Sequence, residues 1–155
     1  MSAVLAETSL DPVLEHARDE ARSAGLPFAG SVSPQNAWAL AQAGAAVIVD
    51  VRSAEERKFV GHVAGVAHVA WASGTSLTRN PRFVRELEAK VRKDEAVLLL
   101  CRSGKRSALA AEAATRAGYA HAFNIREGFE GELDAAQQRG RVDGWRFRGL
   151  PWVQD

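Results

Sequence analysis

The chain contains a single cysteine, and the residues that follow it are of types that favour a reactive thiol. After Cys101 come Arg102, Ser103, Gly104, Lys105, Arg106 and Ser107. Backbone N–H groups in such a loop, and in the first turn of a following helix, have no intrahelical partner and favour negative charge nearby. Three cations within five residues strengthen this preference for the thiolate form. The segment therefore predicts that Cys101 is a nucleophile.

A structural role is the alternative for this cysteine. A lone cysteine in an intracellular protein is most often a small hydrophobe buried at the end of a core strand. Such a role gives no reason for three cations and a glycine to share one turn, because none of them helps an apolar residue to pack. We therefore favour the catalytic interpretation of Cys101.

The sequence around the cysteine predicts a strand, a loop and a helix. Residues 96–100 form an apolar run typical of a buried strand, and residues 107–117 contain strong helix formers. Gly118 then favours the end of that helix. Residues 47–49 predict a second strand that is buried on both faces, as in a parallel sheet.

Two charged residues, Asp50 and Arg52, follow this second strand at its carboxyl end. Open α/β sheets place their sites at this edge, so both residues are candidates to support the active site. Helix capping or an ion pair is the alternative role for them. Ser53 and Glu56 have the spacing of a capping box, which predicts a short helix to about residue 60.

The other segments alternate between helix and strand patterns. An aspartate, a serine and an asparagine, each followed by proline, begin three predicted helices. These helices start at residues 11, 33 and 80, a further helix covers 130–138, strands cover 66–70 and 122–125, and 71–79 is a loop. The pattern predicts an α/β fold with a doubly wound, mostly parallel sheet of about five strands and helices on both faces.

The length of 155 residues is that of one domain. We expect residues 1–32 to form an N-terminal helical extension and residues 33–155 to form the domain, including a C-terminal tail. In that tail, Trp145, Phe147 and Trp152 are expected to pack on the domain while the basic residues stay solvated.

The composition excludes several classes of function. With 46% hydrophobic and 25% charged residues, the chain is typical of a soluble globular protein rather than a disordered or membrane protein. A net charge of +1 argues against a nucleic-acid partner. Residues 1–11 lack the basic residues that open a secretory signal, so a cytoplasmic location is expected. One cysteine allows neither an intrachain disulfide nor a multi-cysteine metal site.

Four segments of the chain, in order, resemble the rhodanese-like domain family, the single-domain sulfurtransferases. The cysteine loop is similar to the active-site loop of that family. The other similar segments are Asp50-Val51-Arg52 with Glu56 and Gly61-His62-Val63-Ala64-Gly65-Val66, residues 124–131 from Asn124 to Gly131, and Gly149-Leu150-Pro151. The chain departs from the family pattern at Ala64, at Glu127 and at Glu132, where the family usually has a proline, a glycine and an aromatic residue.

The resemblance implies a thiosulfate sulfurtransferase that needs no metal or organic cofactor. Cys101 would take the outer sulfur of a small anionic donor as a persulfide and pass it to cyanide, a thiol or a protein acceptor. The acceptor must come from outside or from another subunit, because the chain has no second cysteine. The donor would be bound by Arg102, Ser103, Gly104, Lys105, Arg106 and Ser107, while Asp50 and Arg52 look like supports. The chain is expected to be a monomer or a homodimer.

Two other functions remain open at this point. Dual-specificity phosphatases and related arsenate reductases also use a cysteine thiolate in an anion-binding loop, but with five residues between cysteine and arginine. Only four separate Cys101 from Arg106, which makes the loop tighter and disfavours phosphate. The other alternative is a regulatory binding module or a persulfide relay, in which the loop recognises a protein partner.

Overall fold

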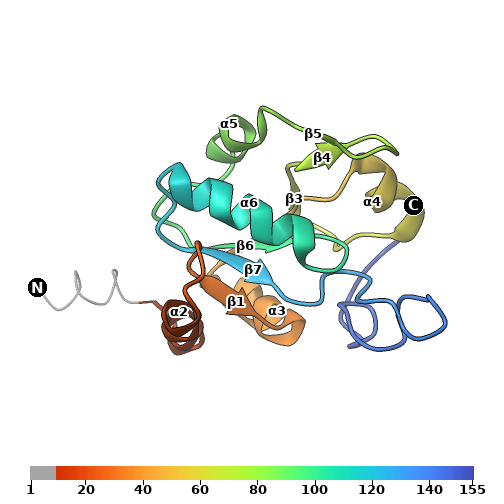
Figure 1. The fold of residues 1–155 in the computed structure, drawn as a ribbon, viewed down its shortest axis with the longest axis horizontal. Helices are drawn as coiled ribbons and strands as arrows, with labels where there is room; N and C mark the ends of the chain where they lie inside the picture. The colour runs from red at the N-terminus through yellow and green to blue at the C-terminus, as the bar shows by residue number, and fades with distance from the viewer. Residues whose placement is uncertain (1–9) are drawn as a thin grey trace, which may run out of the picture.

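The computed structural model describes residues 10–155 and forms an α/β fold with two sheets (Figure 1). The helices, in chain order, are α2 (Pro12–Ala24), α3 (Pro34–Gln42), α4 (Ala54–Val60), α5 (Phe83–Glu88) and α6 (Lys105–Arg116). The strands are β1 (Gly30–Val32), β2 (Val47–Asp50), β3 (Ala67–His68), β4 (Ala72–Ser73), β5 (Thr78–Arg79), β6 (Val97–Leu100) and β7 (Ala122–Ile125).

The central sheet has five strands in the order β1-β7-β6-β2-β3, and every neighbouring pair is parallel. In the register of its middle strands, Leu99 of β6 lies opposite Val49 of β2 on one side and Asn124 of β7 on the other. The prediction of a mostly parallel sheet of about five strands is therefore confirmed. Strand β6 lies in the middle of the sheet, between β7 and β2. Cys101, the residue that follows β6, is therefore close to the segments that follow both neighbouring strands.

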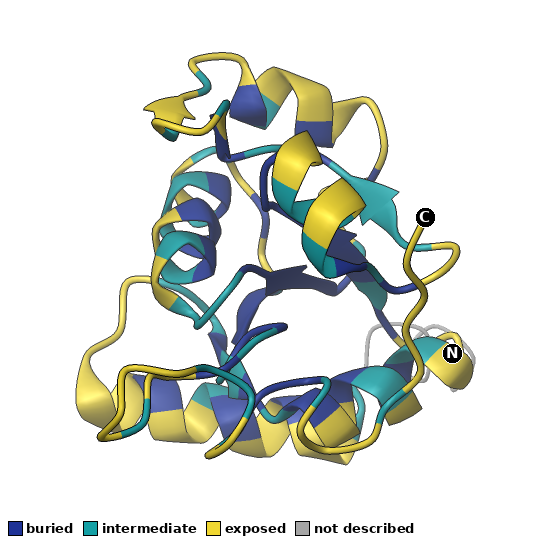
Figure 2. Ribbon diagram, turned by 90° about the vertical axis from the view of Figure 1, so that its right-hand side faces the viewer, coloured by how far each residue is buried: buried dark blue, intermediate teal, exposed yellow. Residues whose placement is uncertain are grey.

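Helices cover both faces of this sheet, with α5 and α6 on one side and α2 and α3 on the other (Figure 1). Side chains of a strand alternate between its faces, so β6 contributes to both cores. Val97, Leu99 and Cys101 face the core under α5 and α6, whereas Leu98 and Leu100 face the opposite core. Figure 2 shows the sheet buried in the centre and the helices exposed on their outer sides. Cys101 therefore lies on the face that α6 covers.

Side-chain caps fix where the helices near the sheet begin. Ser33 accepts a hydrogen bond from the N–H of Asn36 at the start of α3. At α4 the predicted capping box is present, because Ser53 Oγ accepts from the N–H of Glu56 and Glu56 accepts from the N–H of Ser53. Each cap satisfies N–H groups that the first turn of a helix leaves without a partner. The box also fixes the position of the Glu56 carboxylate.

The central sheet includes residues from before the predicted domain boundary at 32/33. Strand β1 is its edge strand and pairs with β7 from Gly30↔Phe123 to Val32↔Ile125. Leu14 of α2 is buried in the same core as Phe123. The helix predicted from residue 11 is thus α2, packed against the domain. The interpretation of residues 1–9 as the start of an extension without a secretory signal lies outside the described residues.

Three local predictions are wrong. Residues 130–138 contain no helix, residues 71–79 contain the antiparallel pair β4 and β5 instead of a simple loop, and the helix expected from residue 80 begins at Phe83. Asn80 does accept a hydrogen bond from the N–H of Arg82, but this closes a turn rather than a helix. These differences lie at the rim and leave the central sheet as predicted.

The C-terminal segment returns to the domain next to α4. Trp145 is fully buried and donates its ring N–H to the carbonyl of Pro151. Phe147 and Trp152 remain 46% and 38% exposed, so the expectation that all three aromatic residues pack on the domain holds fully for Trp145 alone. His62 and Val153 form an isolated antiparallel bridge, which joins the end of the chain to the loop after α4. No helix among residues 10–155 combines the length and the hydropathy that crossing a membrane requires.

Candidate active site

The sulfur of Cys101 lies between the end of β6 and the start of α6. It accepts a hydrogen bond of 3.1 Å from the N–H of Gly104, and Ser107 Oγ lies 3.1 Å from it on the other side. Gly104 has a φ of 104°, a left-handed conformation that favours glycine, and this turn reverses the chain into α6. The sulfur therefore lies between a backbone N–H of the loop and a hydroxyl of the first turn of the helix, where negative charge is favoured.

The segment after β7 holds the cysteine loop through three backbone hydrogen bonds. Phe129 N–H donates to the carbonyl of Cys101, and the N–H groups of Glu130 and Gly131 donate to that of Arg102. The approach is so close that a Cβ on Gly128 would lie 2.4 Å from the carbonyl carbon of Arg102. Because that contact is with backbone, no side chain can relieve it. The loop thus depends on a glycine at position 128.

Asp50 and Arg52 form a buried ion pair at the carboxyl end of β2. Arg52 Nη2 lies 2.8 Å from Asp50 Oδ2 and also donates to the carbonyl of Gly61. Its guanidinium carbon stands 4.2 Å above the centre of the Phe129 ring, at cation–π distance. The pair therefore supports the same segment that binds the cysteine loop.

Arg106 forms a two-pronged ion pair with Glu56. Its Nη1 and Nη2 donate to Oε1 and Oε2 over 2.7 and 2.8 Å, and both side chains are mostly buried. Burial by itself would raise the pKa of Glu56, but hydrogen bonds from Arg106 and from the backbone of Ser53 outweigh it and lower this pKa from 4.5 to about 2. The carboxylate in turn raises the pKa of Arg106. The pair connects α4 to the first turn of α6.

A cavity of about 400 Å³ opens next to the cysteine loop. Arg102 lines it from the loop, Glu55 and Glu56 line it from α4, and Glu130 and Arg139 line it from the C-terminal segment. Arg139 is anchored there by a hydrogen bond of 2.7 Å to the carbonyl of Gly131. Cys101 does not line the cavity itself, because only 1% of that residue is exposed. The two arginines are therefore the cations that a ligand in the cavity meets.

The predicted site residues take different positions. Cys101, Gly104 and Ser107 converge on the sulfur, and Arg102 lines the cavity. Both terminal nitrogens of Arg106 are engaged by Glu56, Lys105 is exposed, and Ser103 is half-buried.

Sequence reasoning did not place three residues in the site. Glu56 was identified as a capping residue, Asn124 as part of a motif, and Arg139 as a solvated charge of the tail. Asn124 Oδ1 accepts a hydrogen bond of 2.5 Å from Ser107 Oγ. The sequence did contain a signal for two of these residues, because Glu56 and Asn124 both lie in segments that resemble the rhodanese-like family. Nothing in the sequence pattern pointed to Arg139, because its segment has no regular periodicity.

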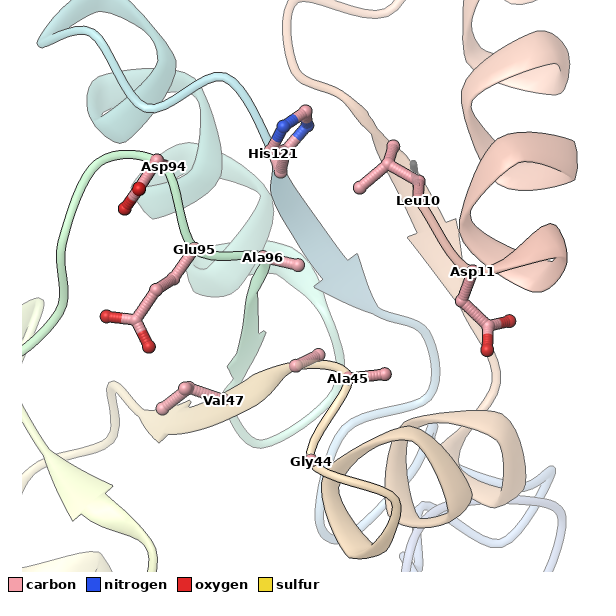
Figure 3. A pocket seen from close by; sticks show the side chains of 10 residues that line it. Leu10, Asp11, Gly44, Ala45, Val47, Asp94, Glu95, Ala96 and His121 are labelled. Carbon is pink, nitrogen blue, oxygen red and sulfur yellow. The ribbon is translucent and has the colours of Figure 1, made fainter. Parts of the chain in front are cut away.

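A second pocket of about 400 Å³ lies at the opposite edge of the sheet, where β2, β6 and β7 begin (Figure 3). Leu10 and His121 line it together with three acidic residues, Asp11, Asp94 and Glu95. Each acidic side chain already has a partner: Asp11 caps α2, Asp94 pairs with Arg92, and Glu95 accepts from the Arg92 N–H. Within residues 10–155, no three His, Cys, Asp or Glu side chains are grouped to hold a metal. The candidate active site is therefore at the carboxyl end of the parallel strands, where Cys101 lies.

Comparisons with known proteins identify the family of this fold. The family model described as "Rhodanese-like domain" matches residues 33–134. The uncharacterized protein RP600 of Rickettsia prowazekii is 37% identical over 111 residues, which cover 69% of this chain and 82% of that protein.

Solved structures extend the similarity to most of the chain. The structure of Rv0390 from M. tuberculosis is 44% identical, with a TM-score of 0.75, and the match covers 83% of this chain and 99% of that one. The polysulfide-sulfur transferase homodimer from Wolinella succinogenes has a TM-score of 0.54 at 23% identity, over 81% of this chain and 78% of that one. At that identity the likeness shows the fold alone.

Proposed function

The chain belongs to the rhodanese-like domain family, and on this premise we propose that it moves a sulfane sulfur from an anionic donor such as thiosulfate to an acceptor through a persulfide on Cys101. The observation that carries the proposal is the environment of the sulfur. Gly104 N–H donates to it and the Ser107 hydroxyl lies at the same distance of 3.1 Å. A sulfur anion at this position gains hydrogen bonds and the field of the α6 N-terminus.

In the first half-reaction the Cys101 thiolate attacks the outer sulfur of thiosulfate. A new S–S bond forms between the two sulfurs, and the bond between the outer sulfur and the sulfite group breaks. Its electron pair leaves with sulfite, and the outer sulfur stays on Cys101 as a persulfide anion. The charge is balanced, since a monoanion and a dianion give a monoanion and a dianion. N–H groups of the loop and of the first helical turn are suited to stabilise that anion.

Cations at the site would attract the donor. Arg102 lines the cavity next to Cys101, and Arg139 lines it from the C-terminal segment. Lys105 adds an exposed positive charge at the start of α6. Arg106 contributes charge from within its ion pair, and its main effect is to hold the loop against α4. Guanidinium groups bind oxyanions by charge-assisted hydrogen bonds, which suits a donor with a sulfonate end.

In the second half-reaction an acceptor removes the outer sulfur. An acceptor thiolate attacks the terminal sulfur of the persulfide, takes it, and returns Cys101 to the thiolate. The acceptor belongs to another molecule, because Cys101 is the only cysteine of the 155 residues. Donor and acceptor then never need to be bound together, so ping-pong kinetics are expected.

The mass of the intact protein tests the persulfide directly. After incubation with thiosulfate, a gain of about 32 Da is expected, corresponding to one sulfur atom. Dithiothreitol should reverse the gain, and the Cys101→Ser variant should not show it. If the reduced protein gains no sulfur from thiosulfate or from other sulfane donors, the transferase proposal is wrong.

A persulfide relay to a protein is the second candidate, favoured by the burial of Cys101, which is only 1% exposed. A relay should transfer sulfur rapidly only to its protein partner, whereas an enzyme that uses small-molecule acceptors should transfer sulfur readily to dithiothreitol or cyanide. Phosphatase activity is disfavoured, since both terminal nitrogens of Arg106 are bound to Glu56. Hydrolysis of p-nitrophenyl phosphate that depends on Cys101 would contradict this.

A further inference from the structure

The hydroxyl of Ser107 lies between two polar atoms in a buried environment. Cys101 Sγ is 3.1 Å away on one side, and Asn124 Oδ1 is 2.5 Å away on the other. The three residues come from the end of β6, from α6 and from β7, and each is at most 8% exposed. Water therefore has little access to these groups, so their hydrogen bonds must be satisfied mainly by one another.

Counting hydrogens shows that this arrangement fits the thiol form of Cys101. A serine hydroxyl has one hydrogen, and here it is donated to Asn124 Oδ1. The contact between Ser107 Oγ and the sulfur then requires the S–H group to be the donor. A thiolate has no hydrogen to donate, so in that state Ser107 must turn its own hydrogen towards the sulfur.

The amide of Asn124 is able to accompany this change. Once Ser107 donates to the sulfur, Asn124 Oδ1 would face an oxygen without a hydrogen, and two acceptors at 2.5 Å repel one another. Half a turn of the amide brings its NH₂ group to Ser107 instead, because an amide carries an acceptor on one side and donors on the other. A carboxylate of the same shape has acceptors on both sides and lacks this option.

We infer that Asn124 is a positioning residue that couples the ionisation of Cys101 to the orientation of its own amide through Ser107. The inference rests on the proposed function, in which Cys101 reacts as a thiolate. When Cys101 is a thiol the amide accepts from Ser107, and when it is a thiolate the amide donates to Ser107. The one proton that leaves the thiol goes to solvent, and no other group changes its protonation.

Charged groups around the cysteine loop are largely paired. From the loop and α6 they are Arg102, Lys105 and Arg106, and from the end of β2 and the residues after it they are Asp50 and Arg52. The others are Glu56 and Arg57 of α4, His68 of β3, and Arg126, Glu127 and Glu130 of the segment after β7. Asp50, Glu56, Glu127 and Glu130 each have an arginine partner. Asn124 is a neutral group that reaches the sulfur through one hydroxyl.

The rate of Cys101 alkylation by iodoacetamide, followed by intact mass against pH, tests the inference. The chain has one cysteine, so the adduct reports on Cys101 alone. We expect Asn124→Asp to raise the pH midpoint by about one unit or more, which slows alkylation about tenfold below the midpoint. Asn36→Asp, at an exposed position of α3, is the control for an added charge and should leave the midpoint unchanged.

A double variant separates an effect transmitted through the Ser107 hydroxyl from a direct effect of the charge at position 124. In the Ser107→Ala background, Asn124→Asp should shift the midpoint much less than it does alone, because the hydroxyl that transmits the effect is gone. Equal shifts in both backgrounds, or no shift from Asn124→Asp, would overturn the inference.

Two further variants cover the case in which Asn124→Asp does not fold. Ser107→Ala should raise the midpoint, because the thiolate loses a donor, and Ser107→Thr should restore it. If Ser107→Ala leaves the midpoint as in the wild type, the inference is also overturned. Alkylation needs no sulfur donor, so these outcomes are independent of whether the wild type forms a persulfide with thiosulfate.

Discussion

Arg106 binds Glu56 through two hydrogen bonds of 2.7 and 2.8 Å, although 50 residues separate the two in sequence. Arg106 lies in the first turn of α6, one residue before Ser107, and Glu56 belongs to the capping box of α4. The ion pair therefore ties the helix that faces the sulfur to the helix that follows Asp50 and Arg52. Loop geometry and stability are coupled through this single contact.

This ion pair predicts a loss of stability in acid. The pKa of Glu56 is lowered from 4.5 to about 2 in the folded state, so its contribution is complete above about pH 4.5 and is lost as pH falls to about 2. One pKa unit corresponds to about 1.4 kcal/mol, which sets an upper limit of about 3.5 kcal/mol. Solvent screening of the partly exposed pair reduces the loss of unfolding free energy expected for Glu56→Gln to about 2 to 3 kcal/mol at neutral pH. Urea unfolding should show this difference shrinking below pH 4.5.

Glu112→Gln is the control for that experiment. Glu112 also pairs with an arginine, Arg116, at 2.6 Å, but the arginine is largely exposed. Exposed pairs of this type contribute about 0.5 kcal/mol or less. If both variants lose the same stability, or if the loss in Glu56→Gln does not depend on pH, the buried ion pair does not have the role assigned to it.

Lys105 and Arg106 should differ in their effects on sulfur donors. Lys105 is exposed, so Lys105→Ala should raise the KM for thiosulfate about three- to tenfold and leave a neutral sulfane donor unaffected. Arg106→Ala removes the contact to Glu56 and should lower activity with both donor types. Steady-state kinetics with one anionic and one neutral donor measure the difference. Lys93→Ala, before β6 at the opposite edge, is the control.

Arg139 should contribute to donor binding from the C-terminal segment. It lines the cavity beside Arg102, so Arg139→Ala should raise the KM for thiosulfate about three- to tenfold with little change in kcat. Arg139→Lys should restore part of the loss. The exposed neighbour Arg141 does not line this cavity, and Arg141→Ala should behave like the wild type. Equal KM values for the variants at 139 and 141 would show that Arg139 does not bind the donor.

Gly128 should be much less tolerant of substitution than Gly44, a glycine with a similar backbone angle. Its φ is 68°, and an added Cβ would lie 2.4 Å from backbone of Arg102. Gly44 has a φ of 73° with no atom within 4 Å of an added Cβ. Gly44→Ala should therefore cost about 1 kcal/mol for the left-handed angle alone, and Gly128→Ala about 3 kcal/mol or more.

Thermal unfolding and activity together check the prediction for Gly128. The Gly128→Ala variant should also lose sulfur transfer, because the three hydrogen bonds to the carbonyls of Cys101 and Arg102 shift with the segment. The Gly44→Ala variant should keep its activity. Similar melting temperatures for the two variants would mean that the segment can move away from the loop without cost.

The sequence determined the elements whose signals are local. The apolar runs at residues 47–49, 96–100 and 122–125 became the three middle strands, because strands buried on both faces have few other places in a fold. The capping box of Ser53 and Glu56 formed as predicted, since its hydrogen bonds involve residues three apart. The loop that follows Cys101 was recognisable for the same reason.

Local signals failed where backbone groups bond to distant partners. Residues 130–138 are not helical, because Gly131 and Gln137 have φ values of 84° and 63°, which a right-handed helix excludes, and the N–H groups of Glu130 and Gly131 bond to the carbonyl of Arg102. Asp134 accepts hydrogen bonds from the N–H groups of Ala136 and Gln138, which competes with a helix. Neither bond to Arg102 is visible in the periodicity of residues 130–138.

Only the tertiary structure decided which partners the site residues have. The sequence supplied three cations after Cys101, but the fold bound one of them, Arg106, to Glu56 and brought Arg139 to the cavity. It also placed Asn124 against Ser107 by setting β7 next to β6. Residue types and short spacings can be read from the sequence. Contacts between residues 17 to 50 positions apart form only when the parallel strands pair in register, because this pairing places the loops and helices that follow the strands next to one another.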